Sequence, residues 1–417
     1  MKKFIIGLIV CAMFFGMTVF AVKGENMTEY VNKNPEITGM LYVDENGYLS
    51  DGTKEVVLNG VNIGNWLICE IWMSPILDPG EKMANSDVIS VLTDRFGKKS
   101  ADEIMNGYMD NYMTEKDFEN IEKLGFNCVR IPFWYRNFMN GGGRWLTDTH
   151  DTNPGIKRLD FALEMCKKYN LYAVLDMHGC PGGQSMNHST GIIGRNELYE
   201  SIDNINAMKT LWTAIARRYK DNIYVAAYDI MNEPQNNSGF DGNRAWKPES
   251  EDAVSRTNKI YSEVTDAIRA VDERHIITIE GVWHTSVLPK PDELKWDNMM
   301  YQLHIYDSTV NDISLQLFSL IWLREQYSTA IYVGEYNCRE NEEFGATVLE
   351  KNHISRTKWN YKTVNADYDG WGLFNKNTTR VDLRNASLAE IKAAMIDGVN
   401  SENGFEFNVE EYNKISR

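Results

Sequence analysis

Two glutamates, each at the end of an apolar stretch, are the residues best placed to do chemistry. One apolar run ends in the polar pair Asn232 and Glu233, and a second run, which begins at Ala330, ends in Glu335. A buried strand whose last residues turn polar is how a parallel barrel presents its catalytic groups. Two carboxylates presented in this way predict cleavage of a glycosidic bond, in which one attacks carbon and the other protonates the departing oxygen.

Other strand-end residues fit the same chemistry. Arg130, near the end of an earlier apolar run, would favour the ionised form of the attacking carboxylate, and Tyr306 could donate a hydrogen bond to it. Asn232, directly before the acid, could bind the 2-hydroxyl of the sugar, a contact that strengthens in the transition state. We therefore expect these side chains to lie together.

The elements that must position these residues alternate regularly along the chain. Apolar, β-branched segments predict strands at 56–63, 126–132, 171–178, 223–233, 275–281, 299–306, 330–335 and 368–374. Helix-period stretches between them include 115–124, 155–169, 197–219, 250–271, 312–326, 344–360 and 387–398. Eight strands with intervening helices predict the α/β class and a single (β/α)8 TIM barrel.

The segment before the first barrel strand predicts an N-terminal β-hairpin. Two short alternating runs between Met40 and Leu58 flank the turn signal Glu45-Asn46-Gly47. The structural alternative to a barrel is a doubly wound open sheet, which would carry a glycine-rich phosphate loop after its first strand. The residues there, Asn62-Ile63-Gly64-Asn65-Trp66, do not match such a loop.

The expected organisation is one catalytic domain, residues 41–398, with a lead-in at 22–40 and a polar C-terminal tail at 399–417. Lys2 and Lys3 precede an apolar run, and Val19-Phe20-Ala21 offers a cleavage site, so residues 1–21 predict a secretory signal peptide. The run is also long enough to remain as a membrane anchor. Either reading places the protein outside the cell or at its surface.

Composition narrows the substrate and the partners. The net charge of −16 argues against nucleic acid, anionic membranes and polyanionic sugars, and favours a neutral substrate. Eleven Trp and 21 Tyr provide rings that can stack on sugars, although most such rings in a protein belong to its core. The cysteines after residue 21 are widely spaced and form no Cys-x-x-Cys pair, which indicates neither a zinc site nor a disulfide framework. We expect a monomer without a protein partner, a metal or an organic cofactor.

Five motifs resemble those of one enzyme family. They are Val-Arg-Ile-Pro at 129–132, Asp-Met-His-Gly at 176–179, Asn-Glu-Pro at 232–234, His-Ile-Tyr at 304–306 and Val-Gly-Glu-Tyr at 333–336. In this order they resemble glycoside hydrolase family 5, the cellulase-type family of retaining (β/α)8 enzymes, over about residues 57–374.

The resemblance implies a role for each motif residue. Glu233 would be the acid/base and Glu335 the nucleophile. The substrate-binding residues would be Arg130, His178, Asn232, His304, Tyr306 and Trp371, with Trp371 in the eighth strand as the platform for the sugar at the cleavage point.

Two further stretches, 59–75 and 178–185, are similar to the exo-β-1,3-glucanase branch of the family. There Glu70 would help to hold the terminal glucose. Asn65 stands where a second glycine is usual and Ile71 where a proline is common, so β-1,3 against β-1,4 linkage, glucan against mannan, and exo against endo attack stay open. Trp283, after the fifth predicted strand, is expected to form an aromatic wall of the cleft, and His284 is a weaker candidate for its rim.

The sequence thus predicts a retaining β-glycosidase that acts on a β-glucan polysaccharide or oligosaccharide. One alternative is a catalytically silent carbohydrate-binding barrel. Another is a metal-dependent barrel hydrolase that uses Asp176 and His178, which would normally need a His-x-His on the first strand that this chain lacks.

Overall fold

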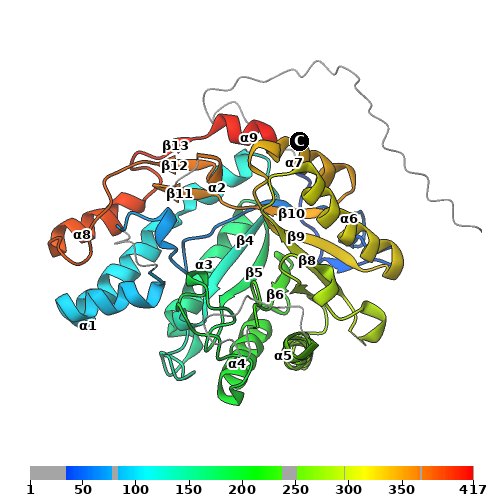
Figure 1. The fold of residues 1–417 in the computed structure, drawn as a ribbon, viewed down its shortest axis with the longest axis horizontal. Coiled ribbons are helices and arrows are strands. Elements are labelled where there is room, and N and C mark those ends of the chain that lie inside the picture. The colour runs from blue at the N-terminus through cyan, green and yellow to red at the C-terminus, as the bar shows by residue number, and fades with distance from the viewer. Residues whose placement is uncertain (1–33, 78–82, 237–250, 295, 367–368, 417) are drawn as a thin grey trace, which may run out of the picture.

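The computed structural model describes residues 34–77, 83–236, 251–294, 296–366 and 369–416; the predicted signal peptide and residues 22–33 lie outside them. The barrel closes in the order β10-β3-β4-β5-β6-β7-β8-β9, and its neighbouring strands run parallel (Figure 1). Its strands are β3 (Asn59–Asn62), β4 (Cys128–Trp134), β5 (Tyr172–Gly179), β6 (Val225–Asp229), β7 (Ile276–Glu280), β8 (Met299–Ile305), β9 (Ala330–Tyr336) and β10 (Ser355–Lys358). The predicted (β/α)8 barrel is confirmed.

The eighth strand is not where the sequence pattern placed it. β10 closes the barrel by pairing with β9 and β3, and it lies inside the segment that was predicted as a helix, 344–360. Its sequence, Ser-Arg-Thr-Lys, has no apolar run, because Arg356 and Lys358 are buried through ion pairs with carboxylates instead. The prediction of a strand at 368–374 is therefore wrong. Of that segment, Tyr368 lies outside the described residues, and the described part forms a short 3-10 helix (Asp369–Trp371) and the start of β12 (Phe374–Lys376).

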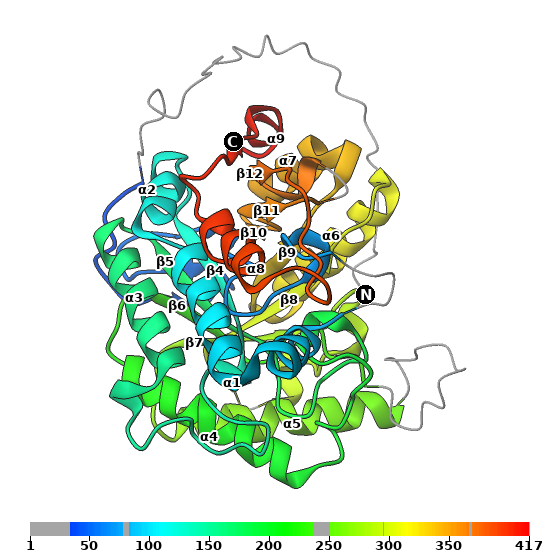
Figure 2. The same cartoon turned by 90° about the vertical axis from the view of Figure 1, so that its left-hand side faces the viewer.

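Helices surround the barrel on its outer side (Figures 1 and 2). They are α1 (Asn85–Tyr112), α2 (Glu115–Lys123), α3 (Pro154–Lys168), α4 (Ile202–Tyr219), α5 (Glu251–Arg269), α6 (Val310–Tyr327), α7 (Glu342–Lys351), α8 (Leu388–Met395) and α9 (Val409–Ile415). Helix α1 is absent from the predicted set, although Val88, Leu92, Ile104 and Tyr108 are buried at helical spacing. Gly97, with a φ of 78°, interrupts this helix. The interruption also breaks the apolar periodicity from which the helix could have been predicted. Of the helices in the described residues, none is both long and apolar enough to cross a bilayer.

The predicted hairpin is present and closes one end of the barrel. β1 (Tyr42–Val43) pairs antiparallel with β2 (Leu49–Ser50). Leu41 and Leu49 pack with Cys128 and Tyr172, which begin their barrel strands, in one buried apolar cluster. Polar function is therefore confined to the opposite end, where the strands finish.

The chain after α8 packs back onto the barrel. β13 (Glu406–Phe407) joins β12 and β11 (Lys362–Val364) in a small three-stranded sheet. In α9, Glu411 binds the buried Lys358 at 2.8 Å, and the Tyr412 hydroxyl donates to the Leu124 carbonyl at 2.7 Å. The five cysteines of the described residues are buried and free, so none of them forms a disulfide.

Candidate active site

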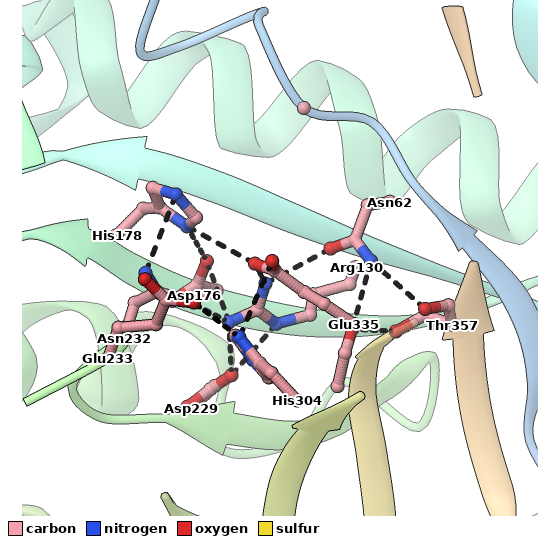
Figure 3. Close-up of polar contacts among 12 residues, drawn as sticks. Asn62, Arg130, Asp176, His178, Asp229, Asn232, Glu233, His304, Glu335 and Thr357 are labelled. Carbon is pink, nitrogen blue, oxygen red and sulfur yellow. Dashed lines mark hydrogen bonds and ion pairs between the residues drawn. The ribbon is translucent and has the colours of Figure 1, made fainter. Parts of the chain in front are cut away.

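The buried guanidinium of Arg130 is the centre of the polar cluster at the strand ends (Figure 3). Its Nη1 donates to Glu335 Oε1 at 2.7 Å, its Nη2 to Asn232 Oδ1 at 2.8 Å, and its Nε to Asp229 Oδ2 at 2.9 Å. Burial alone would lower the pKa of Arg130, but the carboxylates of Asp176, Asp229 and Glu335 raise it well above its usual value. One permanent cation on β4 thus joins side chains from β5, β6 and β9 and from the loop that follows β6.

Glu335 is held at both carboxylate oxygens. Arg130 donates to Oε1, and the Tyr306 hydroxyl donates to Oε2 at 2.6 Å. These two donors stabilise negative charge on Glu335 and fix its orientation. This is the environment that a carboxylate nucleophile needs.

Glu233 has the opposite environment. It lies four residues beyond the last residue of β6, its φ is 39°, and its Oε1 lies 3.0 Å from His304 Nδ1. Burial raises the pKa of Glu233 to about 7, against a lowering influence of His178 and Arg130. A carboxyl group with such a pKa is still protonated in about half of the molecules at pH 7, so it can serve as a general acid there.

Glu280, at the end of β7, is a site residue that the motifs did not identify. Its Oε2 accepts the backbone N–H of Glu233 at 2.7 Å, and its Oε1 lies 3.4 Å from His304 Nδ1. Burial, followed by the charge of Glu233, raises the pKa of Glu280 well above its usual value. Glu280 therefore anchors the backbone of Glu233. The signal for it was present, since Glu280 follows the apolar run Ile276–Ile279 just as Glu335 follows its own.

The spacing of Glu233, Glu280 and His304 would also allow a metal ion, since one ligand atom of each lies within 4.8 Å of the others. Their atoms already bind one another and the Glu233 backbone, an arrangement that fits a shared proton better than a cation. Asp176 and His178 bind each other at 2.8 Å, and Arg130 Nη2 lies 3.1 Å from Asp176. The guanidinium of Arg130 thus occupies the position at which the alternative, metal-dependent hydrolase would bind its metal ion through Asp176 and His178.

His178 and His304 differ in charge. Burial disfavours the charged form of His178, but Asp176 outweighs this and raises the pKa of His178 to about 9. The ring of His178 stacks on Trp359, with 5.6 Å between centroids and 13° between planes. Burial lowers the pKa of His304 to about 3, so this ring is neutral beside the two glutamates.

Glu70 is buried and forms a polar cluster with its neighbours. Trp72 Nε1 donates to Glu70 Oε2 at 2.8 Å, and His188 Nε2 lies 3.5 Å from the same oxygen. Burial alone would raise the pKa of Glu70, but the hydrogen bond and charge of His188 lower it. An ionised carboxylate here is suited to accept hydrogen bonds from sugar hydroxyls.

Trp371 does not lie in the eighth strand, so that part of the prediction is wrong. It ends a 3-10 turn, and its ring lies 5.8 Å from that of Tyr306 and 5.0 Å from that of Trp72, which keeps it at the mouth of the site. The aromatic residue that follows the eighth strand is Trp359, which the misplaced strand concealed. Trp283 stands across Tyr306, with 6.2 Å between ring centroids, as expected for a wall of the cleft.

The structure brings ten sequence-predicted site residues to one end of the barrel. They are Glu70, Arg130, His178, Asn232, Glu233, Trp283, His304, Tyr306, Glu335 and Trp371. His284 lines an adjacent cavity. The residues that sequence reasoning did not identify are Asn62, Asp229, Glu280 and Trp359.

Comparison with known proteins adds a family match. The family model described as Cellulase (glycosyl hydrolase family 5) matches residues 93–379. A β-xylosidase from Phanerodontia chrysosporium is 27% identical over 280 residues, which are 65% of this chain and 51% of that protein. Endoglucanase C from Acetivibrio thermocellus is 31% identical over 208 residues, 48% of this chain and 52% of that protein. A glucan 1,3-β-glucosidase from Candida oleophila is 30% identical over 189 residues, 42% of each.

The chain spans about half the length of these curated relatives. Among solved structures, rutinosidase from Aspergillus niger superposes with a TM-score of 0.59 at 15% identity, covering 77% of this chain and 92% of that one. At this identity the likeness concerns the fold.

Proposed function

Since the chain belongs to glycosyl hydrolase family 5, we propose that it hydrolyses the glycosidic bonds of a β-glucan with retention of anomeric configuration. The observation that carries the proposal is the contrast between the two glutamates. Glu335 receives two charge-stabilising donors, whereas burial raises the pKa of Glu233 to about 7. A double displacement needs this division between an ionised nucleophile and a protonated acid.

In the first step Glu335 attacks the anomeric carbon while Glu233 gives its proton to the departing oxygen. In the second step Glu233, now ionised, takes a proton from the incoming water, which releases the sugar from Glu335. Arg130 and Tyr306 orient the nucleophile. Asn232, whose amide oxygen accepts from Arg130, presents its amide nitrogen for the 2-hydroxyl.

The proposed substrate is a neutral β-glucan chain or oligosaccharide. The names of the relatives, an endoglucanase, a glucan 1,3-β-glucosidase and a β-xylosidase, support β-linked neutral sugars, as does the net charge of −16. The carboxylate of Glu70, oriented by Trp72 and His188, is suited to bind the hydroxyls of a terminal sugar, which favours attack from chain ends. We further propose a monomer that is exported by the predicted signal peptide and needs neither cofactor nor protein partner.

Product analysis tests the proposal. The protein is incubated with laminarin, carboxymethylcellulose and glucomannan, and anomers are followed by proton NMR during the first turnovers. We expect glucose from laminarin, with the β-anomer appearing first. Early α-anomer would exclude retention, and a rapid fall in viscosity would exclude attack from chain ends. Glycan affinity without turnover would instead establish the silent binding barrel.

A further inference from the structure

A cavity of about 620 Å³ adjoins the site on the side of β7, β8 and α6. Trp283, the ring of Tyr306 and Leu315 of α6 form the apolar part of its lining, and polar residues that include Asp307, Asp312 and Gln316 complete it. Gln316 Nε2 donates to the Trp283 carbonyl at 3.3 Å, which ties the helix to the loop that forms the other wall. The cavity is thus bounded by packed elements on both sides.

Helix α6 carries an apolar stripe that begins in this cavity. Leu315 is 68% exposed, Phe318 65% and Trp322 46%. Residues at positions i, i+3 and i+7 lie on one face of a helix, so the three side chains form a track about 10 Å long. We call these three residues the α6 stripe. Exposed apolar side chains gathered on one helix face offer a surface on which an apolar group can be buried.

The cavity lies on the side of the acid. Glu233 is held by His304 of β8 and Glu280 of β7, and Trp283 follows β7 directly. The polar cluster of Glu70, Trp72 and His188 comes instead from the segments that follow β3 and β5. The Glu70 carboxylate is suited to accept hydrogen bonds from the hydroxyl-rich sugar that becomes bound to Glu335. The cavity with Trp283, Tyr306 and Leu315 in its wall is then on the side of the group that receives the proton of Glu233.

We propose that the cavity and the α6 stripe bind an apolar leaving group, an alkyl or aryl aglycone, so that the enzyme cleaves glycosides of apolar alcohols as well as glucan. This inference rests on the proposed hydrolysis and specifies its leaving-group side. The ring of Tyr306 joins the two halves, because its hydroxyl binds Glu335 while the residue also lines the cavity. Burial of methylene groups along the stripe supplies the affinity, and its length suits a chain of about eight carbons.

The test is a series of alkyl β-glucosides from ethyl to octyl, used below their micelle-forming concentrations. Beyond ethyl the leaving alcohols are chemically equivalent, so differences in kcat/KM report contacts of the chain. A fully buried methylene group is worth about fourfold. On a half-open track we expect about twofold for each of the six added methylene groups, hence a ratio of about sixtyfold between octyl and ethyl.

The Leu315→Ser/Phe318→Ser/Trp322→Ser variant should reduce this ratio to about threefold or less. All three side chains are exposed, and the buried residues of the same helix are left intact. Ile202→Ser, which removes an equally exposed apolar side chain at the start of α4, is the matched control and should keep the ratio. A flat series in the wild type, or an unchanged ratio in the triple variant, would overturn the inference.

Two further outcomes distinguish a failure of the proposed aglycone site from a failure of the proposed glycosidase activity. If glucan is cleaved while the alkyl series is flat, the proposed function stands and the aglycone site is wrong. If no glycoside is cleaved, binding of octyl and ethyl glucoside is compared by calorimetry. Octyl binding that is at least tenfold tighter, and is lost in the triple variant, supports the site, whereas equal affinities refute it. A dimer that dissociates in the triple variant during sedimentation would show that a second copy covers the stripe, and would also refute it.

Discussion

Two buried cations on barrel strands, Arg130 and Lys358, gather carboxylates in different ways. Arg130 of β4 binds Asp229 and Glu335 at the open end of the barrel, where the Glu233 side chain keeps 15% of its surface exposed. Lys358 of β10 binds Glu342 of α7 at 2.9 Å and Glu411 of α9 at 2.8 Å, and none of these side chains is more than 1% exposed. A buried charge network that keeps one side open can act on a substrate, whereas a sealed one can only hold elements together.

The largest effect is expected from a substitution that breaks the open network around Arg130 without unfolding the protein. Glu335→Gln keeps the shape and the hydrogen-bonding oxygen of the side chain but removes the nucleophile. We expect kcat/KM on a glucan oligosaccharide to fall by at least about 10³-fold, while the free energy of unfolding changes by less than about 1 kcal/mol. Activity assays and urea titrations measure the two quantities. Glu164→Gln on α3 is the control, and near-normal turnover by Glu335→Gln would refute the assignment.

The converse effect is expected at the sealed network. Lys358→Met leaves Glu342 and Glu411 buried without their cation, which we expect to cost about 3–5 kcal/mol in the free energy of unfolding. In the folded fraction, kcat/KM should stay within about fivefold of wild type.

A matched triple variant sharpens this result. Lys358→Met/Glu342→Gln/Glu411→Leu removes the charges together, and it should recover most of the lost stability because no buried charge is left unpaired. Urea titration compares the two proteins. Equal destabilisation of both would mean that packing, and not charge, dominates at Lys358.

A smaller effect is expected from the support of the acid. Glu280→Ala removes the acceptor of the Glu233 N–H and should lower kcat by about 10- to 100-fold with a minor change in KM. Glu280→Gln retains an amide oxygen at that place and should lose less than about tenfold. Steady-state kinetics of the two variants measure the difference. Equal losses would show that Glu280 acts through its charge and does not position Glu233.

The smallest effect is the dependence on pH. The pKa of Glu233, raised to about 7, means that the folded protein prefers the protonated form. The stability that this preference contributes is fully present below the ordinary carboxyl pKa and is lost as pH rises through about 7. Over the same range kcat/KM should fall about tenfold for each further pH unit, because the ionised group cannot protonate a leaving oxygen.

Substrates with different leaving groups check that assignment. An alkyl glucoside needs the proton of Glu233, whereas a dinitrophenyl glucoside departs without it. The alkaline decline should therefore disappear with the dinitrophenyl substrate. An unchanged decline with both would assign the titration to another group.

The contrast between the open network around Arg130 and the sealed network around Lys358 also explains which residues could be predicted from the sequence. Seven strand-end residues of the open network were predicted because parallel strands with apolar interiors end at the same edge, so polarity at each end locates the site. The β10 strand was missed because Arg356 and Lys358 replace its apolar positions, and only the distant partners Glu350, Glu342 and Glu411 make their burial possible. Trp359 was not predicted either, because it directly follows that strand. Ion pairs between residues that are distant in the sequence produce no local periodicity, so the sequence pattern could not indicate this strand.

The backbone conformation of Glu233 affects any attempt to engineer a more thermostable form of this protein. With φ at 39°, a glutamate there stands in the left-handed region that asparagine and glycine tolerate better, at a cost of about 1 kcal/mol. Glu233→Asn is therefore expected to raise the melting temperature while removing the proton donor. A heat-tolerance selection that ignores turnover would enrich inert proteins at this position, so thermal challenge and hydrolysis must be selected together.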